Sequence, residues 1–269
     1  MSGAVGAVDT VDATELDATE LDAIGLDVRD RPLVIRGGAR DQPAVSRWTP
    51  AYLADRIGDV ELAFKHSPTG EHPNFRAASL AEMFARERMT FREFLARAAT
   101  SPSWLFTGDE EFLVRRRDGI TTANDKLAPL LADVAPPAAV PTERLYTVWA
   151  WFSGAGVHTW LHYDNNGCHN LNAQLAGEKS CVLFAPEHVD RLEPFPLGGA
   201  NPATNCSRLP REAIPGDVPR IHATLRAGDL LFIPAWWLHA FDHAGAFNAN
   251  VNWWWKPARP IGCAPARRH

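Results

Sequence analysis

Three residues of this sequence have the types and the spacing of a site for one metal ion. His162 and Asp164 lie two residues apart at the end of an apolar run, and His239 follows another apolar run later in the chain. Residues two apart in a strand point to the same face, so this pair could direct an imidazole and a carboxylate at one ion. With a second imidazole the set leaves about three coordination positions open, which suits Fe(II). An ordinary hydrogen-bonded turn is the alternative, because short motifs often match by chance.

Lys179 and a pair of amides are further candidates for binding a polar ligand. Lys179 is one of four lysines in the chain and enters an apolar run just after Gly177, where it offers a compact cation to a carboxylate. Asn250 and Asn252 alternate with apolar and aromatic residues, and such amides need partners if they are buried. A solvated lysine at a strand end and an exposed strand face are the alternatives.

The second half of the chain has the pattern of an all-β barrel, with short apolar runs separated by Gly, Pro and Asn. The predicted strands are Leu145–Trp151, His158–His162, Asn170–Leu175, Ser180–Phe184, His222–Leu225, Leu230–Pro234 and Phe247–Trp255. The first half carries helix signals instead. Thr49 followed by Pro50 predicts the start of one helix. Thr90 and Glu93 form a capping box for another. We therefore expect a mixed, partly helical N-terminal part that packs on the barrel.

Charge is distributed unevenly along the 269 residues, although the net charge is only -5. Residues 1–30 hold eight acidic residues and one basic residue, whereas the rest of the chain holds 24 acidic and 26 basic residues. The acidic segment lacks aromatic residues and contains a tandem repeat, so it is predicted to be a disordered tail or a fraying helix. The nearly neutral remainder lacks the positive charge typical of nucleic-acid-binding proteins, so we expect no nucleic-acid partner.

Cysteine usage and hydropathy indicate the compartment. The four cysteines form no Cys-x-x-Cys pair, and the chain starts without the pattern of a secretory signal. The longest apolar runs are far shorter than the roughly 18 residues of a membrane span. We expect reduced thiols, no membrane association and a cytoplasmic location.

Six short motifs occur together in an order that resembles the JmjC, or cupin-like, 2-oxoglutarate oxygenases. They are Thr159-Trp-Leu-His162-Tyr-Asp164, Gly177-Glu-Lys179, Leu183-Phe-Ala-Pro186, Gly228-Asp-Leu-Leu-Phe-Ile-Pro234, Trp237-Leu-His239 and Asn252-Trp253. The resemblance implies a mainly β fold, a double-stranded β-helix of the jelly-roll, cupin-like type with flanking N-terminal helices. The expected organisation is an acidic tail at 1–30, a mixed helical part at 31–141, a JmjC/cupin-like barrel at 142–257 and a C-terminal tail at 258–269.

The resemblance also implies the residues of the site. Those that match the iron ligands, and so the catalytic centre, are His162, Asp164 and His239. Those that match contacts of 2-oxoglutarate are Lys179, Thr159, Asn172, Asn252 and Trp104. Lys179 would pair with the distal carboxylate, and Trp104 stands where the family often has a tyrosine. The implied cofactor is Fe(II), and the implied co-substrates are 2-oxoglutarate and O2.

The implied reaction is hydroxylation of a C–H bond, coupled to decarboxylation of 2-oxoglutarate. The spacing from Asp164 to Lys179 is similar to that of the lysyl-hydroxylase-like branch, which favours an amino-acid side chain in a protein or peptide as the substrate. A free amino acid or a natural-product intermediate is the alternative substrate. A catalytically silent barrel that binds a ligand is the alternative of another class, although the intact ligand set favours an enzyme. Whether the chain forms a homodimer is left open.

Overall fold

Two long antiparallel strands organise the fold of the computed structural model, which describes residues 5–12, 24–73, 85–101, 103–106, 112–115, 121–164, 166–195, 205–259 and 261. These strands are β12 (His169–Phe184) and β15 (Leu238–Trp255), and they pair along almost their full length. The register shifts around Gly177, which has a φ of 74°. A Cβ there would collide with the carbonyl oxygen of Phe247. Bulges bend a strand pair, so the two halves of each long strand take different neighbours.

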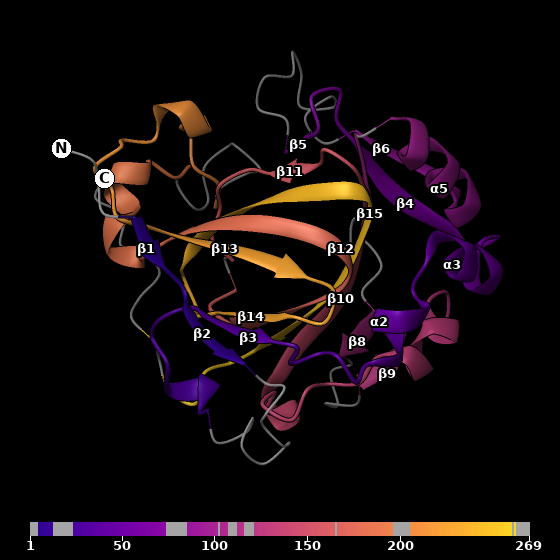
Figure 1. Ribbon diagram of the computed structural model, residues 1–269, viewed down its shortest axis with the longest axis horizontal. Helices are drawn as coiled ribbons and strands as arrows, with labels where there is room; N and C mark the ends of the chain where they lie inside the picture. The colour runs from indigo at the N-terminus through magenta and orange to yellow at the C-terminus, as the bar shows by residue number, and fades with distance from the viewer. Residues whose placement is uncertain are drawn as a thin grey trace.

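The neighbours of the long strands complete a barrel. The first half of β12 pairs with β14 (Leu230–Ile233), and its second half pairs with β13 (Arg220–Arg226). The first half of β15 meets β11 (His158–Thr159), and the second half pairs with β10 (Leu145–Gly154). Figure 1 shows these strands wrapped around one interior. The predicted mainly β, cupin-like fold with flanking helices is therefore confirmed.

Side chains alternate between the interior of the barrel and an outer hydrophobic core. On β10, Val148 and Phe152 belong to the outer core, and Trp253 and Trp255 of β15 lie in the same cluster. The residues that alternate with these on β10 and β15 point into the barrel, and they include Trp149, Trp151, Asn252 and Trp254. The outer core therefore anchors the strands while their other face remains free to build a site.

The helices lie at one side of the barrel (Figure 1). The hydroxyl of Thr49 caps α3 (Pro50–Ile57) by accepting a hydrogen bond from the Tyr52 N–H. Thr90 and Glu93 form a capping box at the start of α5 (Phe91–Thr100). Both predicted helix starts are confirmed.

One hydrophobic core joins the helices to the barrel. The ring of Phe91 on α5 packs edge-on against Phe152 of β10, with centroids 5.1 Å apart, and Phe94 stacks on Phe64 of β4 (Glu61–His66) at 4.4 Å. Because burial of aromatic rings contributes strongly to stability, this shared core holds the N-terminal part against the barrel.

The remaining elements extend the edges of the sheet and connect its strands. The other strands are β3 (Leu33–Arg36), β5 (Glu71–His72), β6 (Arg86–Thr90), β7 (Trp104–Phe106), β8 (Leu113–Arg115) and β9 (Thr121–Ala123). The short helices are α2 (Pro43–Arg47) and the 3-10 turns Leu26–Val28, Ala128–Asp133, Thr142–Arg144, Pro186–Leu192 and Arg211–Ala213. Strands β7, β4 and β6 follow β10 in the sheet, and β3 follows β14.

The acidic segment departs from the predicted disordered tail. β1 (Val5–Ala7) pairs in parallel with β13, and β2 (Asp9–Asp12) pairs in parallel with β3. Leu26 is buried in the outer core. Edge strands present unpaired backbone groups that a further strand can satisfy, which composition alone does not reveal. The prediction of disorder is wrong for residues 5–12 and 24–30, and residues 13–23, with most of the tandem repeat, lie outside the described residues.

Three of the predicted strands are parts of two longer ones. Asn170–Leu175 and Ser180–Phe184 are joined in β12, and the predicted strand at Phe247–Trp255 is only the second half of β15. The sequence analysis missed Leu238–Phe247 because His239 and the glycine-containing stretch after it do not look apolar. This missed half-strand carries the last predicted metal ligand.

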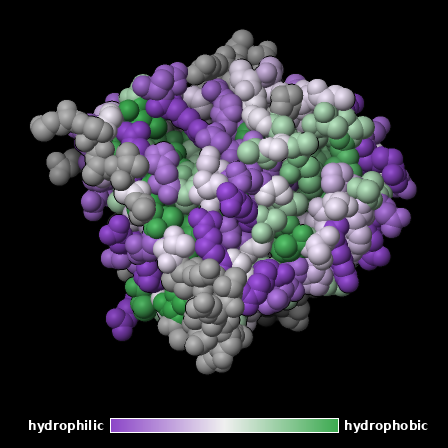
Figure 2. Space-filling view, viewed as in Figure 1, coloured by the Kyte–Doolittle hydropathy of each residue, from purple (hydrophilic) through white to green (hydrophobic). Residues whose placement is uncertain are grey.

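The surface over the barrel carries both hydrophilic and apolar residues. On the face shown in Figure 2, hydrophilic residues run across the middle of the molecule and separate several small apolar areas. Strand β13 contributes to this pattern, because buried and exposed residues alternate along it. Among the described residues, no helix is both long and apolar enough to span a membrane.

Candidate metal centre

The structure brings the three predicted metal ligands together. His162 and His239 form an isolated antiparallel bridge, in which each backbone N–H donates to the other carbonyl at 3.1 and 2.7 Å. Their rings and the carboxylate of Asp164 each offer one ligand atom, and these atoms lie within 4.8 Å of one another. The spacing of two residues predicted in the sequence places Asp164 beside the pair.

Hydrogen bonds orient both imidazoles. Nδ1 of His162 lies 2.8 Å from the carbonyl oxygen of Trp160, and Nδ1 of His239 lies 3.0 Å from that of Trp237. A carbonyl oxygen only accepts, so each Nδ1 carries the proton and each Nε2 keeps a free lone pair. Such a backbone contact fixes the tautomer of histidines that bind metals.

The carboxylate of Asp164 is held in the same way. Its Oδ2 accepts hydrogen bonds from Nδ2 of Asn170 at 3.0 Å and from Nε1 of Trp254 at 2.8 Å. The other oxygen remains to bind an ion. Two neutral imidazoles and one oriented carboxylate are the donor set of non-haem Fe(II) sites, so these residues fit that metal.

Burial keeps one of these ligands in the neutral form. Burial, and then the nearby His162, lower the pKa of His239 to about 4. A histidine must be neutral to bind a metal. His239 is therefore ready to bind a cation at neutral pH.

A cavity of about 400 Å³ opens beside the three ligands. Its walls include Lys179, which is 1% exposed and lies with Nζ 4.6 Å from the ring centroid of Phe241. Burial lowers the pKa of Lys179 to about 7, and none of the ion pairs among the described residues includes it. A carboxylate that entered the cavity would stabilise the charged ammonium.

Comparison with known families agrees with this geometry. A family model described as "Cupin-like domain" matches residues 27–259, which is most of the chain. The chain belongs to the cupin-like family of 2-oxoglutarate oxygenases. This family implies Fe(II) and 2-oxoglutarate, as the sequence motifs also indicate.

Three relatives illustrate the range of proteins with this domain. tRNA wybutosine-synthesizing protein 5 of Danio rerio is 30% identical over 223 residues, which are 80% of this chain and 65% of that protein. The Homo sapiens protein of the same name is 27% identical over 235 residues, covering 84% of this chain and 71% of that protein. Lysine-specific demethylase JMJ31 of Arabidopsis thaliana is 28% identical over 262 residues, covering 84% and 46%.

These relatives bear on the expected partners. The chain spans 65% of the length of the Danio rerio relative, so the activity of a whole relative does not transfer directly. Two of the three names refer to tRNA. They are at odds with the expectation of no nucleic-acid partner, which relied on net charge alone.

Of the other residues predicted to contact 2-oxoglutarate, three line the cavity of this cupin-like barrel and one does not. Thr159, Asn172 and Asn252 line the cavity. Nδ2 of Asn172 donates to Oδ1 of Asn252 at 3.0 Å, and Oδ1 of Asn172 is buried with no hydrogen-bond partner among the described residues. The cavity therefore places all three where a bound molecule could reach them, and their role as co-substrate contacts stays a prediction.

Trp104 lies outside the cavity, which contradicts its predicted role. Its ring packs at a tilt against that of His66, with centroids 4.4 Å apart, and lies under the guanidinium of Arg97. The next residue, Leu105, pairs with Ser153 and lines the cavity. Successive side chains of a strand point to opposite faces, so a prediction wrong by one residue selects the wrong face.

The sequence analysis missed His243, which lies opposite Lys179 in the register of β12 and β15. Its Nδ1 is 2.6 Å from Oγ of Ser153, and the ring lines the cavity. Burial, and then the charge of Lys179, lower its pKa well below the usual value. The sequence analysis did not select it because this half of β15 was missed; on the strand that the structure shows, residues 239, 241 and 243 share one face.

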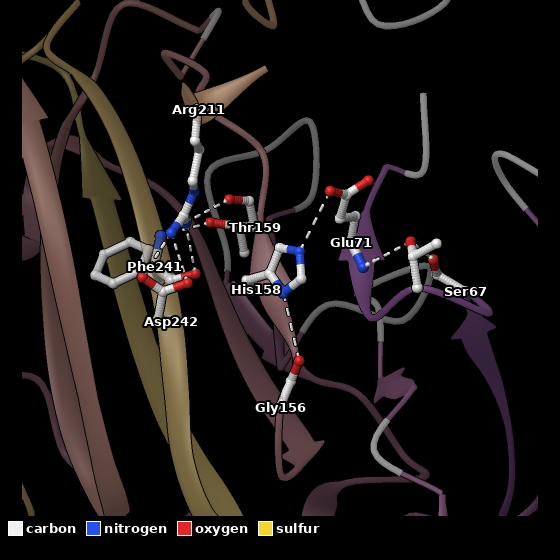
Figure 3. A network of polar contacts seen from close by, with 9 residues as sticks. Ser67, Glu71, Gly156, His158, Thr159, Arg211, Phe241 and Asp242 are labelled. Carbon is white, nitrogen blue, oxygen red and sulfur yellow. Dashed lines mark hydrogen bonds and ion pairs between the residues drawn. The ribbon is translucent and has the colours of Figure 1, made fainter. Parts of the chain in front are cut away.

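Arg211 forms hydrogen bonds with both β11, which carries Thr159, and β15, as Figure 3 shows. Its Nη1 donates to both carboxylate oxygens of Asp242, at 2.7 and 2.6 Å, and its Nη2 donates to the carbonyl oxygens of Thr159 and Phe241 at 3.2 and 3.4 Å. The backbone N–H of Phe241 donates to Oγ1 of Thr159 at 2.8 Å. These bonds join β11 to β15 next to the metal ligands.

Proposed function

We propose that this chain hydroxylates a C–H bond of an organic substrate, using Fe(II), 2-oxoglutarate and O2. The observation that carries the proposal is one cavity that holds both the three oriented ligands and a buried lysine. A metal site alone would fit a structural ion. A lysine buried beside it, with no anionic partner among the described residues, fits a co-substrate that carries a second carboxylate.

The residues of the chain would divide the work as follows. His162, Asp164 and His239 would hold Fe(II), which with 2-oxoglutarate and O2 supplies the oxidant. Lys179 and His243 are paired on neighbouring strands, and both line the part of the cavity where the distal carboxylate of the co-substrate would lie. Trp254 and Asn170 keep the carboxylate of Asp164 in position. No group of the chain has to act as a nucleophile.

The names of the relatives supply two candidate substrates. Those that refer to tRNA favour a group carried by a nucleic acid, and that of the lysine-specific demethylase favours the amino-acid side chain expected from the sequence. A silent binding barrel remains the alternative of another class, and a turnover measurement separates it from an enzyme.

The test is the conversion of 2-oxoglutarate to succinate by the purified protein with Fe(II) and air. This conversion proceeds slowly even without a substrate in such enzymes, so the substrate need not be known. His162→Ala and Asp164→Ala should reduce succinate to the level without protein. His222→Ala is the matched control, because His222 is an exposed histidine on β13. Equal succinate from the wild type and both ligand variants would refute the proposal.

A further inference from the structure

Three indole rings line the cavity on the side of β10. Trp149 and Trp151 project from β10, and Trp254 projects from β15. The ring centroids of Trp149 and Trp151 are 5.4 Å apart at 38°, and those of Trp149 and Trp254 are 6.1 Å apart at 70°. Trp149 and Trp151 are half-buried, so their rings are partly open to the cavity. We call this set, with Asn250 and Asn252, the indole wall.

Hydrogen bonds keep two of these rings in place. Nε1 of Trp149 donates to Oγ1 of Thr147 at 2.8 Å, and Nε1 of Trp254 donates to Asp164. With their N–H groups occupied, these indoles offer mainly their faces to a bound molecule. Flat aromatic rings are the groups that stack best on such faces.

Each indole on β10 lies beside an amide on the neighbouring strand. Trp149 pairs with Asn252 in the register, and Trp151 pairs with Asn250. In the same register, Asn252 pairs with Asn172, whose buried Oδ1 has no hydrogen-bond partner among the described residues. Neighbouring strands are about 4.8 Å apart, so one ring can stack on an indole and present its edge to these amides. A heteroaromatic ring with N–H donors at its edge matches this arrangement.

Charge around the cavity selects against a cationic ligand. Among the described residues that line it, Asp164 is the one carboxylate, and it is already held by Asn170 and Trp254. Lys179 lies inside the cavity. Lys256 does not line the cavity itself but is exposed beside two residues that do: its Nζ lies 4.9 Å from the ring centroid of Tyr146 and donates a hydrogen bond to the carbonyl oxygen of Asn166, and we call this edge of the cavity the rim. A protonated amine would meet two ammonium groups, whereas a phosphate at the rim would meet one opposite charge.

We propose that the indole wall binds the base of a nucleotide and that Lys256 pairs with its phosphate. This proposal rests on the proposed function and names the class of its substrate. Stacking on aromatic side chains is the general mode by which proteins hold unpaired bases, and every base has a face to stack. Oδ1 of Asn172 then accepts a hydrogen bond from the ring edge, and the metal ligands lie beside Trp254, where a substituent of the base would be oxidised.

The experiment measures binding to the whole protein with Fe(II) and 2-oxoglutarate, without oxygen, so that no turnover occurs. Quenching of tryptophan fluorescence is titrated with the four common ribonucleoside 5′-monophosphates, with the matching nucleosides and with a trimethyllysine peptide. At least one monophosphate should give a saturable signal in the millimolar range or below. Trp149→Ala should weaken this binding on the order of 10-fold, and Trp149→Phe, which keeps a stacking face, should weaken it less.

Variants at the rim test the phosphate contact separately. Lys256→Gln should weaken binding of the monophosphate and leave that of the nucleoside unchanged. Lys126→Gln is the matched control, because it removes the same charge in the turn before the 3-10 helix Ala128–Asp133, and it should change neither. Circular dichroism of each variant verifies that it is folded.

Several outcomes would overturn this proposal. They are the absence of saturable binding by any nucleotide, equal nucleotide binding in the wild type and Trp149→Ala, and tighter binding of the trimethyllysine peptide than of every nucleotide. Succinate formation in the same preparation distinguishes this failure from failure of the proposed function. Succinate without nucleotide binding refutes only the substrate class, and nucleotide binding without succinate refutes only the oxygenase.

Discussion

The two walls of the cavity share strand β15 but differ in chemistry. One, which we call the ligand wall, carries His162, Lys179, His239, Phe241 and His243. The indole wall carries neutral amides and tryptophans. Strand β15 supplies His239 to the first and Asn252 to the second, from its two halves. The bulges between β12 and β15 therefore separate a region for ions from a region for an uncharged ring.

This difference shows how one barrel can hold a site for charged ligands beside a site for a neutral ring. A metal ion and a dicarboxylate need charged partners and a dry environment, which the buried ligand wall provides. A neutral ring needs flat apolar faces and a few hydrogen bonds. Trp254 connects the two, because its ring belongs to the indole wall and its N–H contacts Asp164. The following predictions test whether this separation holds.

The largest effect is expected from Asp164→Asn, which keeps the size of the side chain and removes its charge. Affinity for Fe(II), measured by anaerobic titration, should fall by more than about 100-fold, because loss of a metal ligand exceeds the loss of its supporting contacts. Fluorescence quenching by nucleotides on the indole wall should be retained. A parallel loss of both would show that the walls are not separable.

Lys179→Met should raise the Kd for 2-oxoglutarate by about 10- to 100-fold, since one charge-assisted hydrogen bond to the co-substrate is lost. The matched control is 2-oxopentanoate, which lacks the distal carboxylate and should bind both proteins equally. If the monoacid loses as much affinity as the diacid, Lys179 has a structural role instead.

The pH should affect co-substrate binding through the same lysine. Because its pKa is lowered to about 7, Lys179 loses its charge in the free protein as the pH rises above 7, and binding must then take up a proton. The Kd for 2-oxoglutarate should rise by up to about 10-fold per pH unit above 7. Lys179→Met should show no such rise, and a rise of equal slope in this variant would contradict the assignment.

Trp254→Phe tests the contact between the two walls. The ring is kept and the hydrogen bond to Asp164 is lost, so metal affinity should fall by about 10-fold. Trp151→Phe is the control, because no hydrogen bond of Trp151 to a metal ligand is present among the described residues, and it should leave metal affinity unchanged. Equal losses would indicate a general effect of repacking the indole wall.

The smallest effect is expected from His243→Ala. A single neutral hydrogen bond to the distal carboxylate corresponds to a rise of about 2- to 10-fold in the Kd for 2-oxoglutarate. Affinity for 2-oxopentanoate should not change. An unchanged Kd for the dicarboxylate would remove His243 from the co-substrate site and leave Lys179 as its main partner.

Local signals in the sequence were sufficient for helices α3 and α5, though not for α2, and for the pairing of His162 with Asp164. The capping box at Thr90 depends on residues three apart, and the ligand pair depends on the alternation of a strand, so neither needs knowledge of distant contacts. Trp104 shows the limit of such reasoning. Its position along the chain was close to correct, but the face of its strand is decided by pairing with β10.

By itself, the sequence determined the fold class and the types of residues at the candidate metal site, because these follow from short-range patterns and motif order. Only the tertiary structure decided which side chains meet. It joined two predicted strands into β12, added residues 5–12 to the edges of the sheet, and set His243 opposite Lys179. Strand register and edge pairing connect residues far apart in the chain, and no local pattern encodes them.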